Sequence, residues 1–429
     1  MPARRSVVGN GRLPENICWC IANNDNILPI AAVFPASAQD EHNDNDEGNG
    51  STTVPVDQDE DETTATIDDN YTYKLPVIFH VLYNDEKDAT QYIPATRLAA
   101  ILTHVNEIYR GNVYGLEFGT SEEMKIQFVL ATHDESGNKL ATPGVEYVKW
   151  TGTWPIDPME FMGNNKGNVK YIWEPNEYIN VMLYHFAAET DGETLGISHL
   201  PYTLEGVNEI DGLTPLETAK ANVTKKNLSF AYCSSINSKY ANKNADGSYY
   251  ESDRYTNASH KMFEKGVTAQ QISRDINVTL AHELGHYLGL LHVFSETAAG
   301  EEGSETVDDC EDTDYCEDTP SYNRPEYLRG VTAYLNSIQE GEAVSAKRLM
   351  ARNNCAGDDY YSANIMDYAY SYGFKISADQ KSRTRRVLYD SPLIPGPKKR
   401  LRTTRGAVVQ PQLVEGIVDL PIRIAKCKH

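Results

Sequence analysis

Apolar and polar positions follow two different periodicities in the chain after residue 70. Short apolar runs rich in β-branched and aromatic side chains, bounded by polar turn residues, predict buried strands. These runs are residues 75–83, 125–131, 145–150 and 178–184, with a weaker one at 228–232. Residues 94–109 instead carry apolar side chains at the spacing of an amphipathic helix. Together these patterns predict an α/β sheet with helices packed behind it.

Two further helices are predicted nearer the C-terminus. The first begins near Thr268 or Gln270 and places Ile272, Ile276, Leu280 and Leu284 along one apolar side. The second is a capped helix over residues 375–388.

The formal charge of −23 is unevenly distributed. Twelve acidic residues lie between positions 40 and 69, and no Lys or Arg occurs between Arg12 and Lys74. This run is poor in apolar side chains, so we expect residues 1–70 to be an export signal with a pro-segment, or an acidic disordered linker.

The first forty residues contain weak features of an export signal. A short apolar run at 27–34 is followed by Ala36-Ser37-Ala38, which has the small-residue form of a signal-peptidase site. The run is short and contains a proline, so a disordered tail is the alternative. No window is apolar for long enough to span a bilayer. We therefore expect a soluble protein without a transmembrane segment that is exported to the periplasm, the cell surface or the medium.

Residues 277–292 contain the pattern His-Glu-x-x-His-x-x-Gly-x-x-His. On a helix, His282 and His286 lie one turn apart on the same face, so both imidazoles can reach one metal ion. His292 would point away if the helix continued, and Gly289 is the residue that can end it by entering the left-handed region. A helix that stops there allows His292 to complete a three-nitrogen site.

Three neutral imidazoles with one open position are the ligand set of a catalytic zinc, because a structural zinc fills all four positions. Glu283 lies about 100° around the helix from His282, which suits a base better than a ligand. We expect Glu283 to take a proton from the attacking water and to deliver it to the leaving amine of a peptide bond. Two alternatives stay open: core histidines on an amphipathic helix, and a non-catalytic, zinc-containing surface binding or adhesion protein. Glu283 argues against the second, because a base has no role in a structural site.

Three other features admit a functional and a structural interpretation. Residues 307–320 are dense in carboxylates, which suits calcium, but the spacing of an EF-hand is absent and a solvated acidic loop is equally compatible. His80 lies within an apolar strand and is interpreted as a packed histidine. Residues 398–405 are basic, but they form a short tail on an acidic protein, so we favour a solvated or self-docking segment and expect no nucleic-acid partner.

The histidine pattern, followed by Asn-Ile-Met-Asp-Tyr at residues 364–368, resembles the metzincin zinc endopeptidases with their Met-turn. The distance to that turn, residues 316–320 and the opening strand 75–81 resemble the pappalysin branch, peptidase family M43. The resemblance covers about residues 71–390. It implies a metzincin-like α/β (α+β) fold, in which a twisted mixed β-sheet with a backing helix and an active-site helix precedes an irregular C-terminal subdomain with the Met-turn and a C-terminal helix. The expected units are residues 1–70, 71–292, 293–395 and 396–429.

The resemblance also implies roles for individual residues. The implied zinc ligands are His282, His286 and His292. Met366 would lie beneath the zinc as an apolar floor, and Tyr368 would stabilise the oxyanion of the reaction. The implied calcium residues are Asp314, Asp318 and Thr319. The implied activity is that of a zinc metalloendopeptidase acting on protein or peptide substrates, and the oligomeric state stays open.

The chain departs from the family in two places. Residues 295–303 follow the third histidine where the family usually has a short glycine-cysteine segment, which weakens any carry-over of disulfides. Residues 369–373 lack the acids that follow the Met-turn tyrosine in members preferring Arg or Lys. We therefore expect an aromatic-lined pocket that takes an apolar or small side chain.

Seven cysteines give an odd count. Cys310, Cys316 and Cys355 lie close to the site in sequence and allow one loop-stapling pair, of Cys355 with one of the other two. Such a pair would agree with an exported protein. Cys18 or Cys20 could instead cap the zinc in a latent zymogen. The unassigned cysteines are Cys233 and Cys427.

Overall fold

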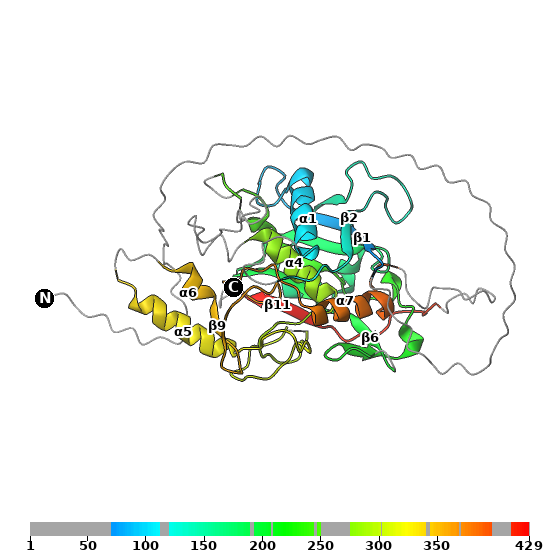
Figure 1. Cartoon of the computed structure of the whole chain (residues 1–429). Coiled ribbons are helices and arrows are strands. Elements are labelled where there is room, and N and C mark those ends of the chain that lie inside the picture. Colours follow the sequence, from blue (N-terminus) through cyan, green and yellow to red (C-terminus); the bar gives the residue numbers. More distant parts are fainter. Residues whose placement is uncertain are drawn as a thin grey trace, which may run out of the picture.

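The protein is described by a computed structural model in which a mixed sheet carries helices on one face (Figure 1). The described residues are 70–111, 120–188, 193–206, 209–243, 247–249, 275–301, 303–339, 344–368, 370–396 and 413–428. Several predictions fall outside them: the acidic run and export signal, Cys18 and Cys20, and the basic residues 398–405.

The central sheet has the strand order β11-β5-β8-β4-β1-β2, and β3 pairs with residues 79–83 of β1, after the stretch of β1 that pairs with β2. Its strands are β1 (Tyr73–Tyr83), β2 (Ile126–Leu130), β3 (Val145–Lys149), β4 (Ile179–Tyr184), β5 (Thr194–His199), β8 (Ser234–Asn237) and β11 (Ile424–Lys428). The pairs β1·β2, β1·β3, β1·β4 and β4·β8 are parallel, whereas β5 runs antiparallel to both of its neighbours, β8 and β11. The expected mixed sheet is confirmed.

Four of the five predicted strands are confirmed, as β1 to β4. The strand predicted at 228–232 is wrong, because the strand in this region begins at Ser234. Leu228, Phe230 and Tyr232 are fully or almost fully buried in a segment without regular structure. A short apolar run indicates that its side chains are buried, but it does not distinguish a strand from a loop. Here the buried side chains belong to a loop that fills part of the core.

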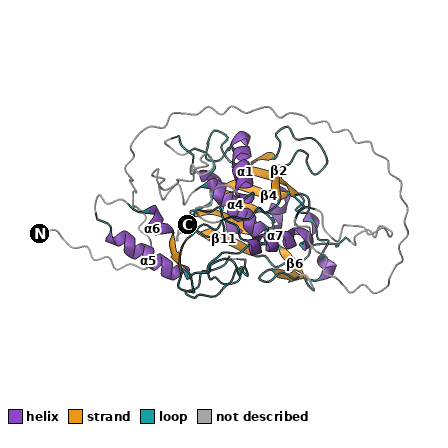
Figure 2. Ribbon diagram, viewed as in Figure 1, coloured by secondary structure: helices purple, strands orange, loops and turns teal. Residues whose placement is uncertain are grey.

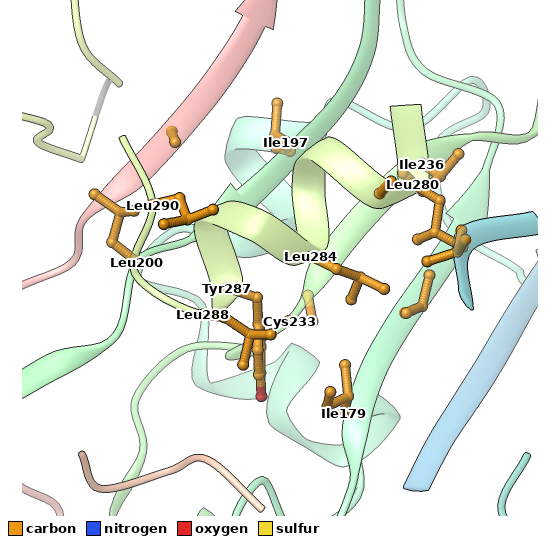
Figure 3. Packing of buried hydrophobic residues seen from close by; sticks show 14 of the residues in the cluster. Ile179, Ile197, Leu200, Cys233, Ile236, Leu280, Leu284, Tyr287, Leu288 and Leu290 are labelled. Atoms are coloured by element: carbon orange, nitrogen blue, oxygen red, sulfur yellow. The ribbon is translucent and has the colours of Figure 1, made fainter. Parts of the chain in front are cut away.

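Helices α1 (Ala95–Tyr109) and α4 (Ile276–Tyr287) pack on the sheet and on each other. The Tyr109 hydroxyl donates a hydrogen bond of 3.0 Å to the carbonyl of Ala281, which fixes one helix against the other. Leu280 and Leu284 of α4 point into the apolar core above the sheet (Figure 3). Helix α4 begins after Asp275, whose carboxylate accepts the N–H of Asn277 at 3.0 Å and caps the helix. The start predicted near Thr268 or Gln270 is therefore wrong, because Asp275 has an extended backbone and ends the helix on that side.

The C-terminal part is less regular, as expected, and places α5 and α6 to one side of the sheet (Figure 2). Its elements are α5 (Arg324–Ser337), α6 (Ala346–Met350), β9 (Ala351–Asn353), β10 (Asp359–Tyr361) and α7 (Ala378–Asp390). The predicted C-terminal helix is α7, which starts with a capping box between Ser377 and Gln380. The remaining short elements are α2 (Pro158–Met162), β6 (Tyr202–Leu204) and β7 (Thr214–Leu216).

Two observations concern the ends of the expected units. Residues 424–428 of the expected tail form β11 and join the sheet. Across the residues listed above, no helix has both the length and the apolar character needed to cross a bilayer.

Candidate metal centre

Helix α4 carries His282, Glu283 and His286 and ends where the glycine pattern predicts. Gly289 has φ +92°, and the Leu290 N–H donates to the carbonyl of Gly285 at 2.9 Å across the helix end. A Cβ on Gly289 would lie 2.6 Å from Cγ2 of Val387, so glycine is required sterically as well as conformationally. The chain turns back at this point and brings His292 to the other two histidines.

The Nε2 atoms of the three histidines form a small triangle. The distances are 2.9 Å for His282–His286, 3.0 Å for His286–His292 and 3.3 Å for His282–His292. Zinc–nitrogen bonds of about 2.0–2.1 Å in a tetrahedral site place ligand nitrogens about 3.3 Å apart. The triangle therefore has nearly the size that one zinc ion requires. Among the residues that the structure describes, these three histidines are the one group of at least three His, Cys, Asp or Glu side chains placed to hold a metal ion.

The other ring nitrogen of each histidine faces a hydrogen-bond acceptor. The acceptors are the carbonyl of Ile365 for His282 (2.5 Å), the carbonyl of Leu290 for His286 (2.8 Å) and the carboxylate of Glu296 for His292 (2.8 Å). A carbonyl or carboxylate oxygen can only accept, so each Nδ1 carries the proton and each Nε2 keeps its lone pair. Three lone pairs that point at one another repel unless a cation lies between them. The chemistry of this donor set fits a metal ion.

The three imidazoles are buried, and burial favours the neutral, metal-binding form of His286. The exposed fraction of His282 is 4%, and His286 and His292 are fully buried. Burial lowers the pKa of His286 well below its usual value, and the two neighbouring imidazoles lower it further.

Glu283 lies between α4 and the inner side of β5 and is fully buried. A Cβ on Gly196 of β5 would be 2.5 Å from Oε1, 2.6 Å from Cγ and 2.8 Å from Cδ of Glu283. Any side chain at position 196 would therefore displace the glutamate. Strand β5 passes directly over the candidate base because it has a glycine there.

The segment 364–368 lies against the histidines. Met366 is fully buried, and its Sδ would be 2.5 Å from a Cβ on Gly285, between the two helical histidines. The Asp367 carboxylate accepts the Tyr322 hydroxyl at 2.6 Å and the backbone N–H of Tyr368 at 2.7 Å. Arg352, also buried, lies 3.4 Å from Asp367. These contacts hold the turn whose Ile365 carbonyl orients His282.

Tyr368 stands beside the imidazoles, with its ring centre 4.5 Å from that of His292 and 6.2 Å from that of His282. Its hydroxyl donates a hydrogen bond to the carbonyl of Lys426 in β11. The guanidinium of Arg324 lies 4.4 Å from the Tyr368 ring centre on a cation–π contact.

Two of the three residues expected to bind calcium are in contact, and the third has a different partner. Asp314 accepts the Thr319 hydroxyl at 2.7 Å, whereas Asp318 accepts the backbone N–H of Asp379 at 3.1 Å. Burial raises the pKa of Asp314 to about 8. Calcium binding here stays a prediction without structural support.

His80 is a packed histidine, as interpreted from the sequence. It is fully buried, and its two ring nitrogens contact Glu146 at 2.8 Å and Asn180 at 3.0 Å.

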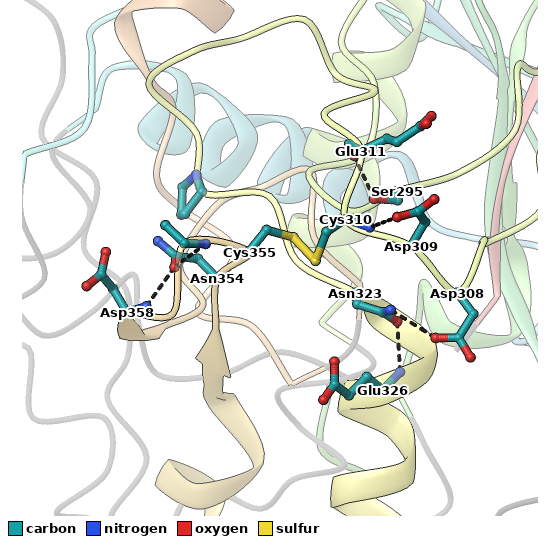
Figure 4. The surroundings of a disulfide bond; sticks show 12 residues. Ser295, Asp308, Asp309, Cys310, Glu311, Asn323, Glu326, Asn354, Cys355 and Asp358 are labelled. Atoms are coloured by element: carbon teal, nitrogen blue, oxygen red, sulfur yellow. Dashed lines mark hydrogen bonds between the residues drawn. A yellow bond between two sulfur atoms is a disulfide. The ribbon is translucent and has the colours of Figure 1, made fainter.

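Cys310 pairs with Cys355 and ties the loop after the third histidine to the turn between β9 and β10 (Figure 4). This is one of the two pairings that the sequence left open, and Cys316 and Cys233 are buried outside any disulfide. A cavity of about 300 Å³ lies beside the Met-turn and is lined by Tyr360, Tyr361, Asp318 and Lys375 among others. Its lining mixes aromatic rings with charges of both signs, and the expected preference for an apolar or small side chain stays a prediction.

Sequence reasoning missed three residues of the site. Gly196 has no local signal, because its role depends on where α4 packs. Glu296 stands four residues after His292, a spacing that could have suggested a partner for that histidine. Asp367 lies within the recognised segment, but its buried partners come from residues 322 and 352.

The three-histidine centre and the match to a peptidase family together indicate a metalloendopeptidase, a hydrolase. Residues 222–389 match the model of peptidase family M43, described as pregnancy-associated plasma protein-A. The match covers 168 of the 429 residues, and over that part the chain is similar to this pappalysin-like family. The match implies a catalytic metal and substrates that are proteins or peptides.

Solved structures similar to this chain include mirolysin of Tannerella forsythia. The mature enzyme in complex with a cleaved peptide is 18% identical with a TM-score of 0.42, over 73% of this chain and 90% of that chain. Mirolysin in complex with compound 9 is 19% identical with a TM-score of 0.42, over 75% and 92%. No curated protein matches the chain in sequence.

Proposed function

We propose that the chain is a zinc-dependent endopeptidase in which Glu283 is the general base. The observation that carries the proposal is the convergence of three Nε2 lone pairs within 3.3 Å, each fixed by an acceptor at Nδ1. His282, His286 and His292 would hold the ion. When bound, zinc supplies a Lewis acid that activates water near neutral pH and polarises a carbonyl group.

The side chains around the centre would divide the proton transfers and the charge. Glu283 would accept the proton of the attacking water on a carboxylate oxygen and then give it to the leaving amine. Its contact with Gly196 holds that carboxylate in place. The Tyr368 hydroxyl would donate to the developing oxyanion, as it now donates to a backbone carbonyl. Met366 would support the histidines from below.

We further propose that residues 71–395 form the catalytic unit, divided after residue 292, and that the protein is exported. The Cys310–Cys355 bond supports export, because disulfides persist in oxidising compartments.

Cleavage of a quenched peptide pool, with zinc content measured in parallel, tests the proposal. The wild-type protein should contain one zinc per chain and lose its activity to a chelator, with recovery on addition of zinc. Glu283→Gln should keep the zinc and lose the activity, whereas the exposed Glu301→Gln serves as the matched control. Wild-type turnover by zinc-loaded Glu283→Gln would exclude Glu283 as the base.

A further inference from the structure

The outer edge of β5 is occupied by the C-terminal segment of the same chain. Strand β11 pairs antiparallel with β5 and places Lys426 opposite Ile197 and Cys427 opposite Gly196. Gly196 is the residue whose inner side contacts Glu283. The backbone of residues 426 and 427 therefore runs along the strand position that adjoins the candidate base.

The other side of β11 faces the site and the loop after the third histidine. The carbonyl of Lys426 accepts the Tyr368 hydroxyl, and the N–H of Ile424 donates to the carbonyl of Gly300 at 3.0 Å. Lys426 Cβ would lie 3.3 Å from a Cβ on Gly303. The unusual segment 295–303 thus holds the C-terminal strand against β5.

Contacts upstream of β11 continue the docking. The Leu200 N–H donates to the carbonyl of Arg423 at 2.9 Å, and the Tyr202 hydroxyl donates to that of Pro421 at 2.8 Å. Asn227 donates to the carbonyls of Val414 and Gly416. The side chains that this segment buries are Leu420, Ile422, Ile424 and Ala425.

We propose that residues 414–428 occupy the outer edge of β5 as an extended peptide would and hold the enzyme in a self-blocked state. The inference rests on the proposed endopeptidase function. An added antiparallel strand is the general way in which a sheet edge binds an extended peptide. Here the added strand presents a carbonyl to Tyr368, as a peptide to be cleaved would. Glu283 and two histidines are fully buried, so a substrate cannot reach them while β11 is in place.

The tether makes the blockade effective. A segment joined to its own binding surface acts at an effective concentration in the millimolar range, so a free peptide must compete against it. Release of β11 should therefore raise activity on peptides without changing the zinc site.

The test compares three forms of the chain on one quenched peptide pool. The first is the full chain, the second ends at Leu413, and the third is the full chain with Ala425→Pro. The backbone of Arg423 bonds towards β5, whereas the backbones of Ile424 and Lys426 bond away from it. Backbone groups alternate in direction along a strand, so the N–H of Ala425 faces β5. Proline at position 425 removes this N–H. Ala425→Gly, which keeps that N–H, is the matched control. Near-UV circular dichroism shows whether each form is folded. If the chain ending at Leu413 does not fold, Ala425→Pro serves alone as the released form.

We expect kcat/KM to be at least tenfold higher for the two released forms, with equal zinc content. A synthetic peptide of residues 414–428 should inhibit them competitively. If the full chain already equals Ala425→Pro in chelator-sensitive activity, the self-blocked state is wrong and the proposed function stands. If every folded, zinc-loaded form is inactive, the proposed function itself fails.

A separate observation concerns Glu296. Two of the three histidines are oriented by backbone carbonyls, but His292 is oriented by a carboxylate that is itself fixed by the Ser304 hydroxyl at 2.7 Å. The Glu296 side chain is 8% exposed. We infer that Glu296 is a positioning residue that fixes the ring orientation of His292 for metal binding, because the carboxylate holds the Nδ1 side of the ring and leaves Nε2 directed at the other two histidines.

Competition with a chromogenic chelator measures this role independently of activity. Glu296→Ala should weaken zinc binding by 10–100-fold. Glu296→Gln, which keeps an acceptor without the charge, should fall between Glu296→Ala and the wild type. Glu301→Gln in the same loop is the control. Unchanged zinc affinity in folded Glu296→Ala would show that the carboxylate has no such role.

Discussion

The glycine at position 196 offers the sharpest test of how the site is built. In Gly196→Ala the new Cβ would lie 2.5–2.8 Å from three atoms of Glu283, whereas ordinary contacts begin near 3.4 Å. The carboxyl group must therefore move by about 1 Å, and a misplacement of this size costs on the order of 10²-fold in rate. Overpacking of a closed core should also cost about 1–3 kcal/mol of stability.

The variant should lose kcat while it keeps its zinc, because Gly196 touches the base and not the histidines. The assay is kcat and KM on a peptide substrate, with zinc content and thermal unfolding in parallel, in both the full chain and a chain ending at Leu413. Gly330→Ala in helix α5 is the control, since a Cβ there meets nothing within 4 Å. If Gly196→Ala retained the wild-type kcat, Glu283 could not be the base in the position described here.

Three further predictions follow from the same contacts. Gly289→Ala places a Cβ against Val387 and forces alanine to φ +92°. We expect a lower melting temperature and weaker zinc binding in chelator competition. Unchanged zinc affinity would mean that the turn does not position His292. Arg352→Met leaves the Asp367 carboxylate buried without its cation and should lower the free energy of unfolding in urea by about 3–5 kcal/mol. Adding Asp367→Asn should restore part of this stability. Additive losses of stability in the double variant would contradict the pairing. Asp314 has a pKa of about 8 in the folded state against 3.8 in the unfolded state, so the stability it contributes is fully present below pH 3.8 and is lost as the pH rises to 8. Asp314→Asn should therefore flatten the decline in unfolding free energy between about pH 5 and pH 8. An equally steep decline in the variant would assign the pH dependence to other groups.

Local patterns in the sequence were sufficient for much of the fold. Strands β1 to β4 and helix α1 were predicted because each has a periodicity that its own residues carry. Strand β5 was missed because Thr194–His199 is a short run with a glycine in the middle. Strand β8 was misplaced because the neighbouring loop is more apolar than the strand itself.

The site divides in the same way. The spacing of His282, His286, Gly289 and His292 lies within eleven residues, and one helix and one turn are enough to relate them. The acceptors that fix their tautomers lie partly outside this stretch, at Ile365 and Glu296. A sequence pattern can propose ligands, but hydrogen bonds between distant segments decide how the ligands are oriented.

The sequence by itself determined the histidine pattern, the glycine that ends the helix, the Met-turn segment and the family to which they point. Only the tertiary structure decided that Gly196 lies on Glu283, that Cys310 is the partner of Cys355, and that residues 424–428 return to the edge of β5. The physical reason is the range of the interactions. Periodicity and turn chemistry act over a few residues, whereas the pairing of β11 with β5 joins segments more than two hundred residues apart and depends on how the whole core packs.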